Sequence, residues 1–390
     1  MHHTLAIERL EITQLRNIAH AKLSFHPGFN VIAGANGSGK TSLLEALYLV
    51  GTSRSFRTSK PREVVRFGAT EATVFSHMDD GGIARTKAIQ LRQAEGQCQR
   101  LVRVDGKRPV TLASFAIQTP VVIFHPGALS LTMGPSAERR NLLDRIALYA
   151  HPDSWLLQSE YTKALRARQK LLQTRGPDAP ELDAFEALLV KNGSTLTRLR
   201  SQAAVALIPP ALLAFQDIAA ADLELAMHYE PSAPDDGLAY LRQLQRSRAD
   251  DARRSSARIG PHRDELALLL FGNPFRTTAS QGQHRALVLA LKSAEMRVIE
   301  EVRGLRPVLL LDDVSSELDA DRARAFFSYL GHAHGQVFIT TTRPELIDES
   351  SEHAEHAKGA APLGTKKNRS DFLVEQGRFT QVFGHDYSHA

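Results

Sequence analysis

A glycine-rich segment followed by a lysine and a threonine gives this sequence its clearest chemistry. Residues 34–41 read Gly-Ala-Asn-Gly-Ser-Gly-Lys-Thr and fit the pattern G-x-x-x-x-G-K-[ST]. Glycines allow successive backbone N–H groups to face a polyphosphate at the positive end of the following helix. In such a loop the lysine reaches the β- and γ-phosphates, and the threonine hydroxyl ligates Mg²⁺. The residues predicted to bind nucleotide, here called the phosphate loop, are Gly34, Ala35, Asn36, Gly37, Ser38, Gly39, Lys40 and Thr41.

The sequence on either side of the phosphate loop supports the same interpretation. Val31 and Ile32 precede the loop, as expected at the end of a buried strand. Apolar residues recur after it at helical spacing, at Leu43, Leu44, Leu47 and Tyr48. A flexible glycine turn is the alternative, but such a turn requires neither an apolar strand before it nor an apolar helix after it. The segment therefore predicts a strand, a loop and a helix that together bind a nucleoside triphosphate.

Two adjacent carboxylates follow a second apolar strand. Residues 308–311 are Val-Leu-Leu-Leu, and Asp312 and Asp313 come directly after them. Asp312 is predicted to hold Mg²⁺ through water together with Thr41, and Asp313 to polarise the attacking water. A strand that ends in an aspartate turn explains this segment equally well on its own. Paired with the phosphate loop, the acids favour a catalytic site in which Lys40 and Asp313 act on the triphosphate.

A third short motif lies between the phosphate loop and the two acids. Ser280, Gln281, Gly282 and Gln283 fit S-x-G-Q. By itself this motif is weak, because Ser280 could simply cap the apolar helix that follows. Residues 315–319 read Ser-Ser-Glu-Leu-Asp, after the acids. The order of phosphate loop, S-x-G-Q, apolar-Asp-Asp and S-x-x-L-D is the order found in ABC-type ATPases.

Composition sets broad limits on the protein class. The chain has 390 residues, of which 43% are hydrophobic and 23% charged, so it can bury a large core. No apolar run approaches the about 20 residues of a membrane span, and residues 1–5 do not resemble a signal peptide. Cys98 is the only cysteine, as is common in a reducing cytoplasm. The net charge of +5 is compatible with nucleic acid without demonstrating it.

The distribution of patterns predicts an α/β protein with an inserted helical arm. Residues 1–135 read as strands around the phosphate-loop helix and form the first part of a head domain. Residues 136–258 read as helical, with a hairpin of two helices broken at 176–180 and ended by the Pro209-Pro210 pair. Residues 259–390 return to strands and complete the head. Within them, 350–369 is predicted to be a mobile loop and 371–375 a final strand.

The ordered motifs resemble the RecF family of bacterial DNA-gap-repair ATPases, which are relatives of the structural-maintenance-of-chromosomes (SMC) proteins. The matching segments occur in the family's order over nearly the whole chain. The most specific of them are residues 260–264, which read Gly-Pro-His-Arg-Asp, and residues 315–319. The matching segments are residues 29–47, 54–57, 139–144, 260–264, 280–283 and 311–319.

The resemblance implies a fold, an activity and partners. The fold would be an ABC/SMC-like ATPase head with a mixed β-sheet and a helical arm. ATP with Mg²⁺ would drive a head-to-tail homodimer, in which Ser280 and Gly282 touch the γ-phosphate bound at the partner's Lys40. The expected protein is cytoplasmic, membrane-free, and a weak DNA-dependent ATPase of replication, gap repair and SOS induction. It would bind single-stranded DNA or its junction with duplex, and act with RecR and RecO to load the RecA recombinase.

Some residues depart from the pattern of the wider superfamily. Gln281 stands where transporter signatures have glycine, and Asp313 replaces the usual glutamate, whose longer reach favours faster turnover. Gly127 follows His125-Pro126 where the family often has an acid. No switch histidine follows Ile339, since residues 340–342 are all threonine.

Basic clusters are the candidate DNA contacts. Arg54 and Arg57 lie nearest the phosphate loop, and Arg139 and Arg140 open the helical region. Arginine and lysine supply salt-sensitive, sequence-independent contacts to phosphates. A solvated helix face is the alternative for each cluster. Further basic residues lie at Lys60, Arg62, Arg66, Lys163, Arg166, Lys170, Arg242, Arg246, Arg248, Arg253, Arg254 and Arg258.

Rival classes explain fewer of these features. An ABC transporter ATPase subunit is the main alternative, but it would place its phosphate loop and acids about half as far apart as Lys40 and Asp312. A phosphotransferase that uses the same phosphate loop has no use for residues 280–283. The helical hairpin is too short for a chromosome-structuring ATPase with a long arm. A nonenzymatic DNA clamp stays open as an alternative if Asp313 is inactive, and ATP turnover would distinguish the two.

Overall fold

The computed structural model describes residues 5–94, 97–219, 223–313, 335–343 and 369–382. The predicted 315–319 motif and most of the predicted mobile loop lie outside these residues. The chain divides into two compact units. Unit 1 comprises Met1–Ala128, Ala214–Ala220 and Arg285–Ala390, and unit 2 comprises Leu129–Leu213 and Ala221–His284.

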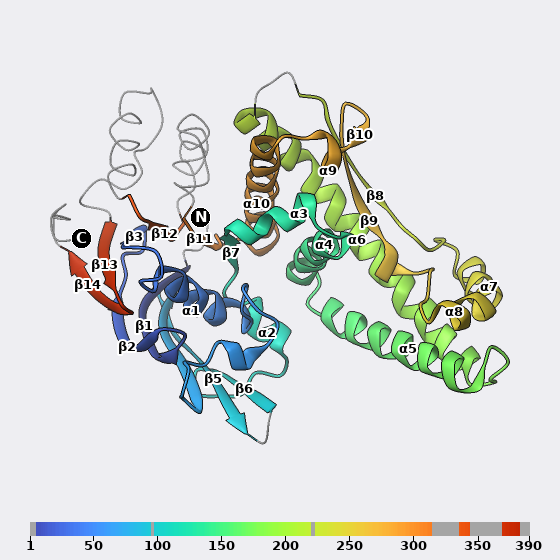
Figure 1. The fold of residues 1–390 in the computed structure, drawn as a ribbon, viewed down its shortest axis with the longest axis horizontal. Coiled ribbons are helices and arrows are strands. Elements are labelled where there is room, and N and C mark those ends of the chain that lie inside the picture. Colours follow the sequence, from blue (N-terminus) through green and yellow to red (C-terminus); the bar gives the residue numbers. More distant parts are fainter. Residues whose placement is uncertain (1–4, 95–96, 220–222, 314–334, 344–368, 383–390) are drawn as a thin grey trace. The chain divides into compact units, whose positions relative to one another are not determined.

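Unit 1 contains a six-stranded sheet in the order β14-β13-β3-β12-β11-β7. All neighbours are parallel except β13 and β14, which form an antiparallel hairpin at one edge (Figure 1). β7 and β11 are buried at every residue, as expected of apolar runs in a parallel sheet. The strands are β3 (Phe29–Ala33), β7 (Val121–Phe124), β11 (Val308–Leu311), β12 (Val337–Thr341), β13 (Arg369–Glu375) and β14 (Arg378–Val382).

An antiparallel sheet in the order β2-β1-β4-β5-β6 is the second layer of unit 1. Helix α1 (Lys40–Thr52) is buried along almost its whole length, and its leucines share one core cluster with both sheets. This burial fixes the start of α1, and with it the phosphate loop. The remaining elements are β1 (Leu5–Leu15), β2 (Ile18–Ser24), β4 (Glu71–Asp80), β5 (Ile83–Ala94), β6 (Gln97–Val104), α2 (Leu112–Ala116), and the 3₁₀ turns η1 (Pro61–Glu63) and η2 (Pro126–Leu129).

A buried lysine makes the stability of unit 1 depend on pH. Lys87 on β5 donates to the carbonyl of Phe115 at 2.6 Å, and its ammonium lies 4.1 Å from the centre of that ring. Burial lowers the pKa of Lys87 from 10.5 to about 7, against an opposing effect of Asp80. Above pH 7 the unfolded chain therefore binds the proton that the folded chain has lost.

We expect wild type to gain stability relative to Lys87→Met as pH rises. The gain is about 1.4 kcal/mol per pH unit between about pH 7.5 and 9, because one proton is taken up on unfolding. Urea unfolding of both proteins at several pH values measures it. A constant difference between the two proteins would contradict the assignment.

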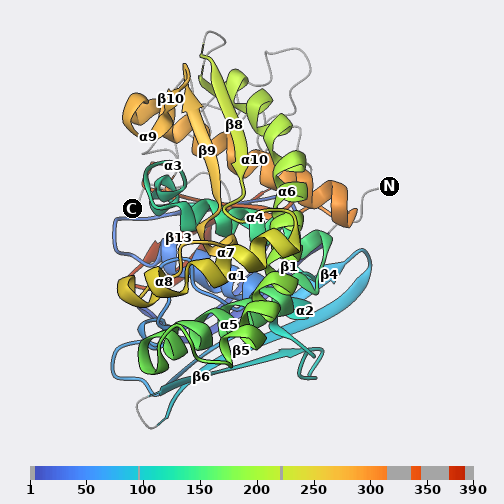
Figure 2. The ribbon, with the colours of Figure 1, turned by 90° about the vertical axis from the view of Figure 1, so that its right-hand side faces the viewer.

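Unit 2 combines helices with a three-stranded sheet in the order β10-β9-β8. Leu189 and Leu196 on α6 share a buried cluster with Tyr161 and Ala164 on α5. Figure 2 shows β8 and β9 side by side. Two helices are shared between the units: α6 (Leu182–Ala219) belongs to unit 1 from Ala214 on, and α10 (Gln281–Arg303) from Arg285 on. The other elements of unit 2 are α3 (Ser130–Met133), α4 (Ser136–Ala150), α5 (Ser154–Arg175), β8 (Leu225–Glu230), α7 (Gly237–Arg246), α8 (Arg248–Arg254), η3 (Pro261–Arg263), β9 (Glu265–Leu270), β10 (Asn273–Pro274) and α9 (Phe275–Thr278).

The unit boundaries differ from those predicted at 135/136 and 258/259. Unit 2 begins at Leu129 and ends at His284. It therefore includes residues 260–264, which the sequence placed in the head domain. The cause is the pairing of β9 with β8, which joins residues 265–270 to strand residues before the predicted boundary. Sequence periodicity does not reveal which strands pair.

One further expectation about a single element is wrong, and another is right only in part. α6 does not end at Pro209-Pro210 but continues to Ala219. Each proline removes one helical hydrogen bond, yet Leu207, Ala211 and Phe215 are buried on the same helix, and their packing outweighs the loss. The strand predicted at 371–375 begins at Arg369 and is not the last, since β14 follows it.

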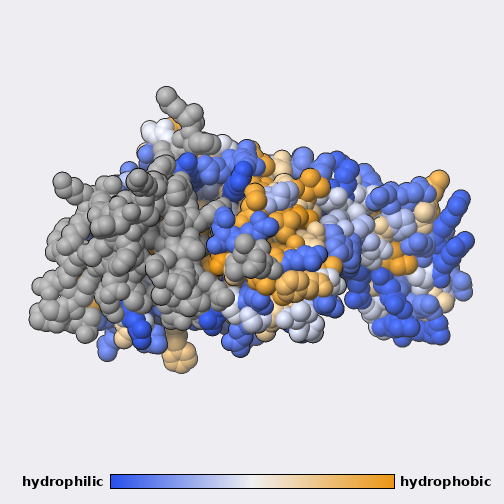
Figure 3. Space-filling model, turned by 90° about the horizontal axis from the view of Figure 1, so that it is seen from above, coloured by the Kyte–Doolittle hydropathy of each residue, from blue (hydrophilic) through white to orange (hydrophobic). Residues whose placement is uncertain are grey.

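α6 is also long and apolar enough to cross a membrane by length and composition alone. Core helices of soluble proteins meet the same criterion, and 39% of its most apolar window is buried. Its uncharged stretch between Gln202 and Gln216 exposes Val205 and Leu213. Figure 3 shows apolar side chains gathered near the middle of its view.

A buried arginine organises the helices of unit 2. Arg168 on α5 is fully buried and pairs with Glu186 on α6 at 2.9 Å and Asp251 on α8 at 2.7 Å. It also donates to the carbonyl of Leu244 at 2.8 Å. Leu244 lies on α7, so one guanidinium of α5 contacts three other helices, α6, α7 and α8.

Replacing Arg168 with methionine should strongly destabilise unit 2. Removing one partner leaves the carboxylates of Glu186 and Asp251 buried without its charge, which costs about 3–5 kcal/mol. Chemical unfolding measures the change, and Arg166→Met on the exposed face of α5 is the matched control. Equal stabilities of the two variants would contradict the role of Arg168.

Candidate functional site

The phosphate loop connects β3 to α1 in unit 1, as the sequence predicted. Lys40 is the first residue of α1, and its Nζ donates to the carbonyls of Gly34 at 2.6 Å and Ala35 at 3.0 Å. Its side chain is therefore folded over its own loop. Burial lowers the pKa of Lys40, while the charges of Asp313 and Asp312 act in the opposite direction. These contacts place one cation where a phosphate group would approach the loop.

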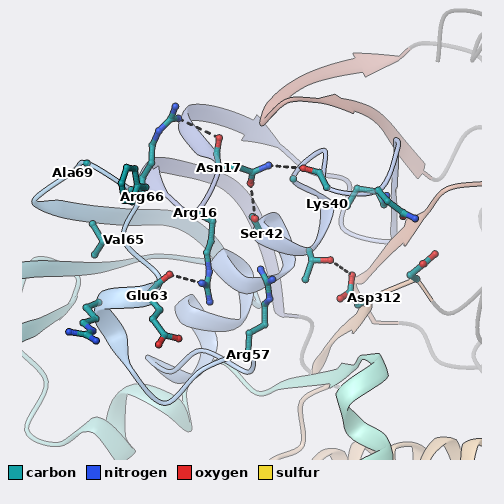
Figure 4. Close-up of a pocket in the computed structure, with 18 of the residues that line it drawn as sticks. Arg16, Asn17, Lys40, Ser42, Arg57, Glu63, Val65, Arg66, Ala69 and Asp312 are labelled. Carbon is teal, nitrogen blue, oxygen red and sulfur yellow. Dashed lines mark hydrogen bonds between the residues drawn. The ribbon is translucent and has the colours of Figure 1, made fainter.

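The two predicted acids lie beside the start of α1. The Thr41 hydroxyl donates to Oδ1 of Asp312 at 2.9 Å, so residues 271 positions apart in sequence meet (Figure 4). The Thr340 hydroxyl lies 3.0 Å from the same oxygen, and the backbone N–H of Asp313 donates to that hydroxyl at 2.9 Å. The ends of β11 and β12 thus bring both carboxylates to the phosphate loop.

The electrostatics of Asp312 suit a divalent cation. Burial raises the pKa of this carboxyl, although hydrogen bonds from Thr41 and Thr340 lower it. Neighbouring Asp313 raises it further, and Arg57 lowers it. A bound cation would stabilise the ionised carboxylate. Mg²⁺ prefers oxygen ligands and binds through one or two carboxylates plus substrate phosphates, so Thr41 and Asp312 fit this ion.

The site extends well beyond the predicted loop. It is an open pocket of about 1090 Å³, and Arg57 lines it as well as Lys40, Thr41 and both acids. Phe67 is fully exposed at this pocket, where an aromatic ring could stack on a nucleotide base. Two of the additional lining residues, Arg62 and Arg66, belong to the basic cluster that the sequence shows after the phosphate-loop helix. No motif marked the others, which are Arg16, Asn17, Ser42, Glu63, Val65, Phe67, Gly68, Ala69 and Gln93.

Two turns from distant parts of the sequence hold the phosphate loop. Asn17, between β1 and β2, donates to the carbonyl of Gly37 at 3.1 Å and accepts from the Ser42 hydroxyl at 2.8 Å. Gly377, between β13 and β14, donates its N–H to the carbonyl of Ser38 at 2.6 Å. The conformation of the loop therefore depends on both turns.

Gly377→Ala should weaken ATP binding by at least about tenfold, or ~1.4 kcal/mol. The backbone φ of Gly377 is +79°, and an added Cβ would lie 2.4 Å from the carbonyl oxygen of Asn17. Relief of this overlap must move the turn away from the loop. Gly106→Ala is the matched control, because its φ is +74° and its Cβ would meet nothing within 4 Å. Titration with a fluorescent ATP analogue measures the affinity of both variants. Equal affinities of Gly377→Ala and Gly106→Ala would contradict the role of the Gly377 turn in holding the phosphate loop.

Of the two predicted DNA contacts in unit 1, Arg57 adjoins the nucleotide pocket. It lies 3.5 Å from Glu45, a fully buried carboxylate on α1 that also accepts two hydrogen bonds from Arg16, at 2.8 and 2.9 Å. Arg54 is exposed and does not line the pocket. Arg57 thus connects the phosphate-loop helix with the solvent-exposed part of the site.

The two predicted DNA contacts in unit 2 are engaged within that unit. Arg139 makes a bidentate pair with Glu265, at 2.7 and 2.8 Å. Arg140 donates to the carbonyl of Asp264 at 2.7 Å and to the Ser136 hydroxyl at 2.6 Å. These contacts attach α4 to the start of β9.

The S-x-G-Q motif begins α10 in unit 2. Ser280 donates its N–H to the Gln283 side chain at 2.7 Å, and the N–H of Gln283 donates to the Ser280 hydroxyl at 3.3 Å. This reciprocal arrangement is a capping box. Gln281 and Gly282 form the first turn of the helix. None of the four residues lines the pocket of unit 1.

Comparisons with known proteins agree over almost the whole chain. The family model described as "RecF/RecN/SMC N terminal domain" matches residues 6–360. The DNA replication and repair protein RecF of Geobacter sulfurreducens is 36% identical, over 86% of this chain and 92% of that relative. Its counterpart in Anaeromyxobacter sp. is 39% identical, over 88% of this chain and 94% of that relative.

Solved structures show the same fold. The recombination mediator protein RecF with ATP, of the RecFOR pathway, superposes with a TM-score of 0.83 at 25% identity, covering 98% of this chain and 99% of that one. An SMC head superposes with a TM-score of 0.53 at 15% identity, over 97% of each chain. The fold is therefore the predicted ABC/SMC-like ATPase head with mixed sheets and helical segments. This chain belongs to the RecF family.

Proposed function

We propose that this protein is an ATP-dependent DNA-binding protein of replication and recombinational gap repair, and a slow DNA-dependent ATPase. The observation that carries the proposal is the hydrogen bond between Thr41 and Asp312, two residues that line an open pocket together with Lys40. Family membership supports it, because relatives are named DNA replication and repair proteins and a solved RecF contains ATP.

In the proposed mechanism each residue has one task. The loop N–H groups and Lys40 bind the β- and γ-phosphates, which replace the Gly34 and Ala35 carbonyls as acceptors for Nζ. Thr41 and Asp312 would hold Mg²⁺, which would supply positive charge to neutralise phosphate oxygens. Asp313 orients and polarises the attacking water. Its short side chain, in place of glutamate, accounts for slow turnover.

We further propose that the complete site forms only in an ATP-bound homodimer. Ser280 and Gly282 of one subunit would contact the γ-phosphate at Lys40 of the other, with Gln281 and Gln283 in the same helical turn. The positive end of α10 favours this role. The observed capping box keeps the Ser280 hydroxyl at that end of the helix. Hydrolysis would then limit how long the dimer stays on DNA.

The proposed partners are single-stranded or gapped DNA, RecR and RecO, with RecA loading and SOS induction as the outcome in the cytoplasm. Arg54 and Arg57 are the proposed DNA contacts nearest the nucleotide. Arg139 and Arg140 are weaker candidates because their guanidinium groups already have partners in unit 2. Exposed Lys163 and Arg242 represent the basic surface of that unit. The family gives no support to the transporter alternative.

Arg57→Ala tests the coupling between nucleotide and DNA. We expect ATP to strengthen wild-type binding to a gapped oligonucleotide and to have a much smaller effect on the variant. Fluorescence anisotropy with and without ATP measures this, and Arg108→Ala is the control at an exposed arginine of unit 1. If ATP stimulates DNA binding equally in all three proteins, Arg57 is not the link.

A further inference from the structure

A buried threonine contacts both acidic residues of the site, the carboxylate of Asp312 and the backbone of Asp313. Thr340 is the fourth residue of β12 and is fully buried. It stands in the region after Ile339 where related ATPases carry a switch histidine and this sequence has three threonines, at 340–342. Its hydroxyl is the only part of the side chain that can form hydrogen bonds, so its partners indicate its role.

The Thr340 hydroxyl contacts both acids at once. It accepts the backbone N–H of Asp313 at 2.9 Å and can donate its one proton to Oδ1 of Asp312 at 3.0 Å. The other acceptor in reach, the carbonyl of Leu311, is more distant at 3.4 Å. A hydroxyl has one donor and two acceptor positions, so it can make both short bonds together.

The backbone of Asp313 needs such support. Its φ is +53°, in the left-handed region that few residues with a Cβ adopt. The N–H bond to Thr340 helps hold the residue in that conformation. Without it, Asp313 could relax to a different backbone angle and turn its carboxylate away from the phosphate loop.

We propose that Thr340 is a positioning residue for ATP hydrolysis, fixing the direction of both carboxylates through one hydroxyl. This inference rests on the proposed ATPase function. In hydrolysis a water oxygen bonds to the γ-phosphorus, the bond from that phosphorus to the bridging oxygen of ADP breaks, and one water proton passes by way of the Asp313 carboxylate to the phosphate released. Asp313 must face that water, and Asp312 must stay with Thr41.

Substitution of Thr340 by valine and by serine distinguishes the contribution of the hydroxyl from that of the shape of the side chain. Thr340→Val keeps the volume but removes both hydrogen bonds, whereas Thr340→Ser keeps the hydroxyl. We expect valine to lower the single-turnover rate of phosphate release by about 10–100-fold, as for loss of a positioned hydrogen bond in an active site. The ATP dissociation constant should change by less than about threefold, and serine should restore most of the rate.

The control is Thr119→Val, another buried threonine of unit 1, whose hydroxyl contacts only the sulfur of Met78 among described residues, at 3.8 Å. Its rate should equal that of wild type. Thr340→Val with a wild-type rate, or valine and serine variants equally slow, would overturn the positioning role. Wild type that neither binds nor hydrolyses ATP would instead contradict the proposed function itself.

Discussion

We expect Lys40→Met to abolish most ATP binding, with the dissociation constant rising by about 100-fold or more. The reason is the loss of a charge-assisted contact to phosphate, for which hydrogen bonds to charged groups contribute about 1.5–3 kcal/mol each. Lys40 has the geometry for this contact because its Nζ already lies over the loop, 2.6 Å from the carbonyl of Gly34. Methionine fills similar space, so the fold should persist.

Calorimetric titration with ATP and Mg²⁺ measures this effect directly. Lys22→Met is the matched control, since that lysine is exposed on β2 and pairs only with Glu11 among described residues. We expect the control to bind as wild type does. Equal affinity of Lys40→Met and wild type would remove Lys40 from the nucleotide site.

Asp313→Asn should slow hydrolysis by about 100-fold or more while leaving ATP affinity nearly unchanged. A positioned general base contributes typically about 10²–10⁴-fold, and an amide cannot take that role. Asparagine suits the substitution because it tolerates the left-handed backbone that Asp313 adopts, with φ of +53°. The change therefore removes the charge without moving the chain.

Phosphate release and ATP binding are measured in parallel for this variant. Asp235→Asn, at an exposed carboxylate of unit 2, is the control for general effects of charge. A variant that binds ATP but does not hydrolyse it should also accumulate as the ATP-bound dimer. Unchanged turnover would mean that another group polarises the water.

Local patterns predicted the phosphate-loop region well. A strand, a glycine loop and a helix are encoded within residues 29–52, and the apolar run before Asp312 marks a buried strand of the same sheet. Both acids come at the end of that strand, so their approach to Thr41 follows from parallel strand order. Short motifs in a known order were enough to predict this part of the site, because each motif lies within a single strand, loop or helix.

Contacts between distant segments could not be predicted from the sequence. Nothing near Asn17 or Gly377 indicates that both touch the phosphate loop, since each sits in an ordinary turn. The length of α6 depended on packing around its two prolines rather than on the prolines themselves. Long-range packing decides such features, and a single sequence does not record it.

Charge was the least informative signal. Arg139, Arg168 and Arg248 lie in basic or helical stretches, yet the structure pairs each with carboxylates of its own unit. A sequence shows the sign of a charge but not its partner. Counting arginines therefore overstated how much of unit 2 is available to DNA.

Sedimentation of wild type and Lys40→Met, with and without ATP and gapped DNA, tests the central claim most directly. The proposed composite site predicts that wild type is monomeric without ATP and dimeric with it, that gapped DNA sediments with the dimer, and that Lys40→Met stays monomeric throughout. A wild-type protein that hydrolyses ATP while remaining a monomer would contradict the account and leave a P-loop enzyme that works as a single subunit.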